Sequence, residues 1–416
     1  MADAVSEAAL PSVTEPPSAC LDIEAARASA TGTALQSGLE RARANARARS
    51  SDPTAWVQLG RAWLRVARET GDAGFTLHAD ACAGVALEHD AEHAGALGIR
   101  QAVLMTSHEF ARAREIAARV LSRSPDDLSA WLTASDAALE LGDIDAAVRA
   151  AQRALDLEPG LASYSRAAYG SWLHGDVPRA IELMRLAIDA AGSPEDREPR
   201  AWALTQAALL FWHRGDYAGA AAGFELAREV RPRHAPALVG LAQVAAANGE
   251  LTRARDLYAS ALELHPDVDT AARLGDVLTR LNDAGAEAAY RRAEALGRSD
   301  RRALSLYYSA HEREPAAALE LARAEFAVRP DPYTEDVLAW ALHRNGHEGE
   351  ALAHIEHARR LGTPDARLMF HHGAIALAAG QLERGRALLR AVLAQNPRFD
   401  LRGEEELRRL LGARPS

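Results

Sequence analysis

Residues 204–232 read LTQAALLFWHRGDYAGAAAGFELAREVRP, and residues 238–266 read LVGLAQVAAANGELTRARDLYASALELHP. Each stretch predicts a first apolar helix, a Gly-Asp or Gly-Glu turn, and a second helix that ends at a proline. The second helices share alanine, an aromatic residue and alanine at spacings of four and three, namely Ala220, Phe224, Ala227 and Ala254, Tyr258, Ala261. Small residues let two antiparallel helices approach closely, and the bulky residue fills the gap to the next hairpin. The sequence therefore predicts a repeated helical hairpin.

The same unit recurs outward along the chain with a period close to 34 residues. Prolines stand at positions 125, 159, 232, 266, 330, 364 and 397. The intervals 125–159, 232–266 and 330–364 are each 34 residues, and the step from 364 to 397 is 33. Proline cannot extend the second helix of a hairpin, and glycine suits the left-handed turn after the first helix. The spacing therefore predicts one hairpin for each period.

Composition agrees with a helical chain, because Ala, Leu, Glu and Arg are abundant and only 5% of the residues are aromatic. We expect residues 34–397 to form the repeat solenoid, starting with a helix over about Ala34–Arg49. Residues 1–33 are rich in Ala, Ser, Pro and Thr without a sustained apolar period, so we expect a flexible N-terminal segment. Residues 398–416 are expected to form a C-terminal capping helix and a tail.

This pattern resembles the tetratricopeptide repeat family. Trp56, Leu59, Gly60 and Trp63 match the first-helix part of its motif. The resemblance covers roughly residues 53–397 and implies an all-α fold, a right-handed α-solenoid of about ten repeats. The C-terminal part also resembles a bacterial group of uncharacterised multi-repeat proteins, through Leu338-Ala339-Trp340-Ala341-Leu342 and Leu361-Gly362-Thr363.

The resemblance also implies where a partner would bind. First helices of successive repeats line a concave groove in this family, which makes the chain a protein–protein interaction scaffold for a peptide or helix. Carried onto this sequence, the candidate groove residues are Tyr169, Trp172, Trp202, Thr205, Trp212, His213, His343 and Arg344. Aromatic side chains are common anchors at interfaces. The alternative is that Trp172, Trp202 and Trp212 pack between helices as ordinary core, and Trp340 is expected to do so.

Charge and motifs exclude several other functions. The formal net charge is −10, which argues against nucleic-acid binding. All 48 basic residues are arginine, so a phosphate-loop lysine and a Schiff-base lysine are excluded. No nucleophile elbow or dinucleotide fingerprint occurs. We therefore expect no enzyme activity and no cofactor.

Histidines gather between residues 343 and 372 and support a competing hypothesis. The pairs His343/His347 and His354/His357 have helical spacings that would place two rings on one face. Asn345-Gly346 is expected to break the helix between the first pair. A metal-binding protein or enzyme built on these repeats is therefore one alternative. A self-assembling solenoid, in which Leu401–Leu411 docks into a neighbouring groove, is another and would make the protein a homo-oligomer.

The two cysteines and the hydropathy bear on location. Cys20 and Cys82 provide neither a disulfide framework nor a zinc cluster, and Cys82 is expected to be a small core residue. No run of 18 apolar residues occurs, so we expect no transmembrane span. We expect a cytoplasmic protein; a periplasmic or secreted one is the alternative if an upstream signal has been removed.

Overall fold

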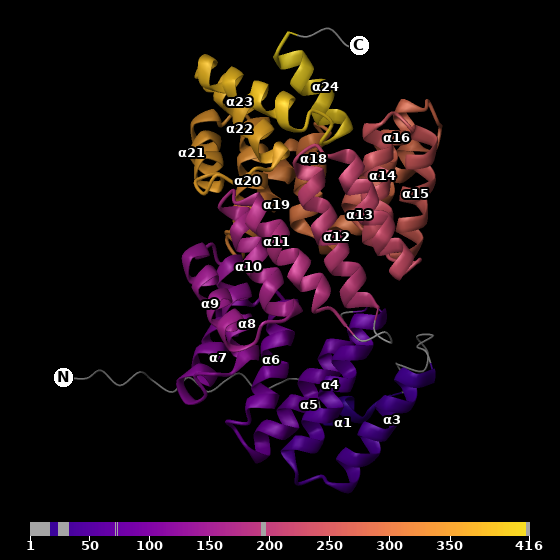
Figure 1. Ribbon diagram of the computed structural model, residues 1–416, viewed down its shortest axis with the longest axis vertical. Coiled ribbons are helices and arrows are strands. Elements are labelled where there is room, and N and C mark those ends of the chain that lie inside the picture. The colour runs from indigo at the N-terminus through magenta and orange to yellow at the C-terminus, as the bar shows by residue number, and fades with distance from the viewer. Residues whose placement is uncertain (1–16, 24–32, 71, 73, 193–196, 413–416) are drawn as a thin grey trace, which may run out of the picture. The chain divides into compact units, whose positions relative to one another are not determined.

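The computed structural model describes residues 17–23, 33–70, 72, 74–192 and 197–412 (Figure 1). Within these ranges the chain forms helices and turns without a strand. The predicted all-α solenoid is confirmed. Among the described helices, none is long and apolar enough to cross a membrane.

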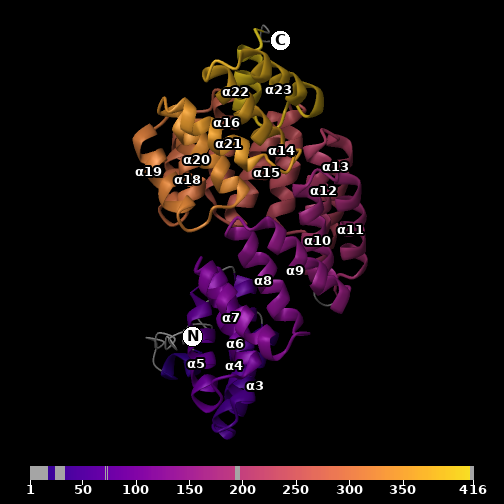
Figure 2. The same cartoon turned by 90° about the vertical axis from the view of Figure 1, so that its left-hand side faces the viewer.

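The repeating element is a pair of consecutive helices, and paired helices run alongside each other in two perpendicular views (Figures 1 and 2). A short helix α1 (Pro17–Leu21) and helix α3 (Thr33–Ala48) precede the pairs. The pairs are α4 (Pro53–Thr70) with α5 (Phe75–His89), α6 (Ala94–Thr106) with α7 (Phe110–Arg123), α10 (Leu161–Leu173) with α11 (Val177–Asp189), α12 (Glu198–His213) with α13 (Tyr217–Val230), α14 (Ala235–Ala247) with α15 (Leu251–Leu264), α16 (Val268–Arg280) with α17 (Ala286–Leu296), α18 (Arg301–Ala310) with α19 (Pro315–Phe326), α20 (Pro332–Arg344) with α21 (Glu348–Ala358), and α22 (Ala366–Ala378) with α23 (Leu382–Gln395). Helices α8 (Leu128–Glu140) and α9 (Ile144–Leu157) come between α7 and α10 in the sequence. Helix α24 (Leu401–Leu410) follows the last pair.

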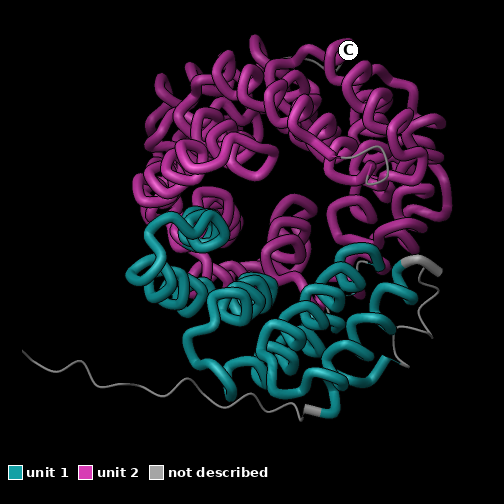
Figure 3. The backbone as a smooth tube through the Cα atoms, turned by 60° about the horizontal axis from the view of Figure 1, so that its bottom comes forward, with its two compact units in different colours: residues 1–137 teal, residues 138–416 magenta. Residues whose placement is uncertain are grey.

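The chain divides into two compact units, Met1–Ala137 and Ala138–Ser416, and each is described by itself (Figure 3). In the first unit, α1 packs on the α4–α5 hairpin. The indole Nε1 of Trp63 donates to the carbonyl oxygen of Cys20 at 2.9 Å. The rings of Trp63 and His78 stack with centroids 4.4 Å apart.

A disulfide bond between Cys20 and Cys82 joins α1 to α5. The sequence predicted no disulfide framework and a Cys82 that is a small core residue. Cys82 is fully buried, as predicted, but it also forms this disulfide. Only tertiary packing brings the two cysteines together, because 62 positions separate them in sequence. Most of the expected flexible segment 1–33 lies outside the described residues. The described part holds two fully buried side chains, Cys20 and Ile23.

Hairpin packing in the second unit follows the small–bulky–small pattern. Ala220, Phe224 and Ala227 of α13 have no exposed surface. Gly240 of α14 lies against the Phe224 ring, so closely that a Cβ atom there would overlap the ring. Removing the aromatic side chain from such a site would leave a cavity and cost about 3–5 kcal/mol. The repeat pattern therefore encodes contacts between neighbouring helices.

The second unit also returns on itself, so that its C-terminal hairpins lie beside its earlier ones (Figure 3). The turns at Gly142, Gly175 and Gly215 meet the backbone that precedes α20, α22 and α24. We call this junction the seam. It is closed by hydrogen bonds from Arg360 Nη2 to the Gly142 carbonyl (3.3 Å), from Thr363 Oγ1 to the Leu173 carbonyl (2.7 Å) and from Asn396 Nδ2 to the Trp212 carbonyl (2.8 Å).

The predicted capping helix is α24, and Asp400 caps its N-terminus. Leu407 of α24 is fully buried against its own chain. Arg280 of α16 forms an ion pair with Glu405 at 2.6 Å, and Arg344 of α20 one with Glu406 at 2.8 Å. Docking of this helix into a neighbouring molecule would therefore require these internal contacts to break.

Candidate partner-binding face

Six side chains of the second unit converge next to the seam, and we call them the inner face. They are Tyr169 and Trp172 of α10, His213 of α12, Tyr333 of α20, and Asp365 and Arg367 at the start of α22. Trp172 Nε1 donates to the Tyr333 hydroxyl at 3.1 Å. The rings of Trp172 and His213 have centroids 4.6 Å apart. His213 Nδ1 lies 3.6 Å from Asp365 Oδ2. The face thus combines helices from both ends of the unit.

Helix geometry holds Asp365 in place. Its Oδ1 accepts from the backbone amides of Arg367 (2.9 Å) and Leu368 (3.2 Å), as an N-cap does. Burial alone would raise the pKa of Asp365, but the charge of Arg367, the two amides and His213 in its protonated form together lower it. Asp365 is therefore ionised at neutral pH.

His213 is neutral at neutral pH. Burial lowers its pKa, and this effect outweighs the opposing attraction of Asp365. The distance of 3.6 Å between His213 Nδ1 and Asp365 Oδ2 is too long for a hydrogen bond. Asp365 therefore offsets only part of the lowering of the His213 pKa that burial causes. The negative charge of the Asp365 carboxylate is consequently not neutralised by His213.

Tyr169 is the exposed member of the inner face, with 36% of its surface accessible. Burial nevertheless raises its pKa, with further contributions from Asp331 and Glu140. Tyr169 is therefore partly exposed while its surroundings disfavour the phenolate. A partly exposed phenol offers a partner both a ring and a hydroxyl.

The other predicted groove residues have different roles. Trp172 and Trp212 are 4% and 5% exposed, so they serve as core. Thr205 is buried, and its hydroxyl donates to the Ala201 carbonyl at 2.9 Å. Trp202 is partly buried in the cluster that contains Trp172.

His343 and Arg344 lie at the opposite end of α20 from Tyr333. His343 Nδ1 is 2.8 Å from Glu348 Oε2. The Arg344 guanidinium covers the Trp340 ring, 4.4 Å from its centroid. Trp340 is buried, as expected for core. The predicted residues therefore do not form one continuous groove.

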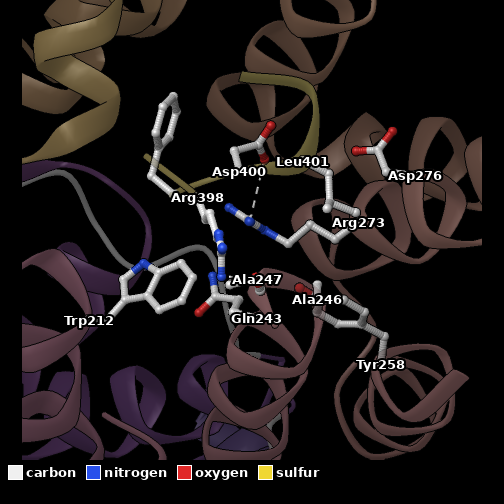
Figure 4. Close-up of a pocket in the computed structure, with 11 residues that line it drawn as sticks. Trp212, Gln243, Ala246, Ala247, Tyr258, Arg273, Asp276, Arg398, Asp400 and Leu401 are labelled. Atoms are coloured by element: carbon white, nitrogen blue, oxygen red, sulfur yellow. Dashed lines mark hydrogen bonds and ion pairs between the residues drawn. The ribbon is translucent and has the colours of Figure 1, made fainter. Parts of the chain in front are cut away.

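A pocket lies farther along the second unit, between α12, α14, α16 and the segment before α24 (Figure 4). It encloses about 310 Å³, part of it open to solvent. Its walls include the Trp212 ring, the Gln243 amide and the Tyr258 side chain. Arg273 and Arg398 both line it, and each carries a guanidinium group. Burial raises the pKa of Tyr258, so its phenol stays protonated.

The histidine-rich repeats use their rings for internal pairing. The buried Glu335 contacts both His354 (3.2 Å) and His357 (2.5 Å). His371 Nδ1 lies 2.8 Å from Asp336 Oδ1. Helix α20 ends before Asn345-Gly346, so His343 and His347 belong to different elements, as expected. Among the described residues, no group of three or more His, Cys, Asp or Glu is arranged to hold a metal ion.

The sequence alone did not single out three residues that complete these regions, namely Asp365, Arg273 and Arg398. Arg398 directly follows the period-marking Pro397, and Asp331, Asp365 and Asp400 precede helices at a nearly constant spacing. That spacing was the available signal, because aspartate is a preferred N-cap residue.

Stacked helical hairpins with these shared spacings define an α-solenoid, a class built to present extended surfaces to other proteins. Residues 104–168 and residues 205–269 each match a family described as tetratricopeptide repeat. The chain is therefore a tetratricopeptide-repeat protein, as its sequence motifs predicted. Tetratricopeptide repeats support a general role in binding protein partners. The suggested bacterial relationship stays a prediction.

Comparison with other proteins adds similarity of fold only. No curated protein matches the sequence. The solved structure of the APC/C hetero-tetramer Cut9–Hcn1 is 14% identical and covers 94% of this chain and 98% of its own, with a TM-score of 0.37. Yeast Tom70 is 13% identical and covers 91% of this chain and 95% of its own, with a TM-score of 0.40. MamA is 17% identical over 39% of this chain and 87% of its own, with a TM-score of 0.32.

Proposed function

We propose that the protein is a non-enzymatic scaffold that binds a peptide or helix of a protein partner on the inner face of its second unit. The observation that carries this proposal is the environment of Tyr169. Tyr169 is an exposed large side chain beside the buried Trp172 and the partly buried Tyr333. A partner that covers Tyr169 buries an aromatic anchor at little entropic cost.

Charged groups beside Tyr169 would orient the partner. The Arg367 side chain lies 3.7 Å from Asp336 and is 30% exposed. Asp365 is ionised beside a neutral His213. The inner face therefore offers one positive and one negative group besides its aromatic anchor. This arrangement suits a polar peptide with an apolar contact at its centre.

Partner capture followed by reconstitution tests the proposal. The wild type and a Tyr169→Ala variant of equal helicity would be used to capture proteins from native extract. The captured protein would then be purified and its affinity measured by calorimetry. We expect Tyr169→Ala to weaken binding by about 10-fold or more, since an anchor residue contributes about 2 kcal/mol.

Leu226→Ser provides the matched control, because Leu226 is an exposed apolar residue of α13 that contributes nothing to the inner face. It should bind like the wild type. Equal affinities for wild type and Tyr169→Ala would show that the partner binds elsewhere.

The disulfide favours the predicted alternative location. Buried disulfides between distant residues are typical of proteins that fold in oxidising compartments. Cys20 and Cys82 are both fully buried, so the bond is shielded from solvent reductants. We therefore propose a periplasmic or secreted location. Alkylation of the protein before and after reduction, in its native cells, would test this.

A further inference from the structure

Arg398 enters the pocket without a carboxylate partner. Its Nη1 donates to the Ala247 carbonyl at 3.0 Å, and its backbone amide donates to the Tyr217 hydroxyl at 3.3 Å. No ion pair joins this guanidinium to a carboxylate in the part of the chain that the structure describes. The side chain is also exposed. Its positive charge is therefore available to a ligand.

Arg273 provides a second cation in the same pocket. Its Nε contacts Asp269 Oδ2 at 2.7 Å, and its Nη1 lies 3.5 Å from Asp400 Oδ2 (Figure 4). Nearby carboxylates hold its pKa well above its usual value, although burial opposes them. Arg273 is thus held in one orientation by Asp269, while its contact with Asp400 is loose.

The two carboxylates that line the pocket also have contacts outside the arginine pair. Asp400 Oδ1 caps α24 by accepting from the amides of Arg402 (3.0 Å) and Gly403 (2.9 Å), while its Oδ2 lies 3.5 Å from Arg273 Nη1. Asp276 Oδ1 accepts from the Tyr290 hydroxyl at 2.9 Å and lies 2.9 Å from His311 Nε2. Neither carboxylate forms an ion pair with Arg398 among the described residues, so this guanidinium is the cation of the lining that a ligand can pair with.

We propose that Arg273 and Arg398 form a subsite that binds an acidic side chain of the protein partner. This inference rests on the proposed scaffold function and names the chemistry that one part of the partner must have. Guanidinium groups bind carboxylates through charge-assisted hydrogen bonds, and arginine suits this task better than lysine. The Gln243 amide and the Trp212 ring complete the walls.

The subsite is built from two parts of the chain that are distant in sequence. Arg273 belongs to α16, whereas Arg398 lies in the connection between α23 and α24. The two groups meet because the second unit returns on itself at the seam. An acidic residue bound between them would therefore also link the two sides of the seam.

Binding of a charge-defined peptide tests this subsite in the full-length protein. The probe is a fluorescein-labelled 12-residue peptide of alternating Glu and Ala, followed by fluorescence anisotropy at low salt. A peptide of alternating Arg and Ala with the same label serves as the charge control. We expect the acidic peptide to bind and the basic peptide to bind at least 10-fold more weakly.

Arg398→Gln is the decisive variant, because Arg398 is exposed and, among the described residues, its side chain makes only a hydrogen bond to the Ala247 carbonyl and no ion pair. It should weaken acidic-peptide binding at least 10-fold. Arg386→Gln removes an exposed arginine of α23 outside the pocket and should change binding less than 2-fold. Equal binding by wild type and Arg398→Gln would overturn the proposal.

Competition with small anions distinguishes a carboxylate subsite from a phosphate site. Partner capture distinguishes failure of the subsite proposal from failure of the scaffold proposal. Displacement of the peptide by millimolar phosphate, but not by acetate, would overturn the carboxylate assignment in favour of a phosphate ligand. If the wild type binds neither peptide while capture of a partner still depends on Tyr169, the subsite fails and the scaffold proposal stands.

Discussion

Replacing Gly142 with alanine should open the seam, whereas the same change at Gly249 should not. Both glycines follow the first helix of a hairpin and have φ near +75° to +79°. Alanine in this left-handed conformation costs about 1–2 kcal/mol at either position. The two sites differ only in their surroundings. A Cβ atom at Gly142 would lie 2.6 Å from the Pro330 carbonyl oxygen, while nothing lies within 4 Å of one at Gly249.

The extra cost at Gly142 follows from the bonds beside it. Arg329 Nη2 donates to Glu140 Oε1 at 3.0 Å, and Arg360 Nη2 donates to the Gly142 carbonyl at 3.3 Å. Hydrogen bonds to charged groups contribute about 1.5–3 kcal/mol each when buried and less when exposed. Arg329 and Glu140 are only partly buried, so we expect about 2 kcal/mol beyond the backbone cost.

Hydrogen exchange measured by mass spectrometry resolves this difference, because it reports local opening rather than global unfolding. In Gly142→Ala, amides around Arg329 and Tyr333 should lose protection about 30-fold, as 2 kcal/mol implies. In Gly249→Ala those amides should exchange as in the wild type. Equal protection in both variants would refute the idea that the seam contributes to stability.

Three further predictions concern stability. Reduction of the Cys20–Cys82 bond should destabilise the first unit by about 4 kcal/mol, because the bond closes a long loop and so restricts the unfolded chain. Thermal unfolding with and without reductant measures this loss. A Cys20→Ser/Cys82→Ser variant that still responds to reductant would contradict the prediction. Burial, with Arg359 and Arg384, lowers the pKa of His372 to about 4, and Arg359 donates to its Nδ1, so the folded protein holds this ring neutral. As the pH falls, the unfolded state binds this proton before the folded state does. The contribution of the neutral His372 to stability is therefore complete above about pH 6.5 and is lost toward pH 4, by about 2 kcal/mol after allowance for solvent screening. Urea unfolding at several pH values should show a smaller loss in His372→Asn, and an equal loss would exclude His372. Trp212→Ala should cost about 3–5 kcal/mol, because this ring packs against Phe224 and Leu241; unchanged stability in urea would make Trp212 a candidate binding residue again.

The hairpins were predictable because their determinants are local. The Ala–bulky–Ala spacing, the glycine after most first helices and the proline after most second helices all act between residues of one or two repeats. Phe224 shows this, since it packs against Gly240 of the next hairpin. The pattern recurs in enough hairpins that one sequence reveals it, although His108, Asn282 and Glu312 take the left-handed position of glycine in three of them.

The candidate site was predictable only in part. The resemblance placed Tyr169, Trp172 and His213 in a partner-binding groove, and their role in binding stays a prediction. It could not separate Tyr169, which reaches solvent, from Trp172, which the Tyr333 hydroxyl and the His213 ring cover. That distinction depends on which distant hairpin lies opposite, and no repeat carries this information by itself.

The sequence alone therefore determined an all-α chain, the hairpin repeat and the order of its helices, because neighbouring residues decide those features. Tertiary structure alone decided the seam, the convergence of Arg273 with Arg398 and the pairing of Cys20 with Cys82. The Trp212–Asn396 hydrogen bond, for example, spans 184 positions. Contacts between residues so far apart in the sequence depend on the small rotation between each repeat and the next, summed over several repeats. The period of the sequence gives the number of repeats but not the size of each rotation.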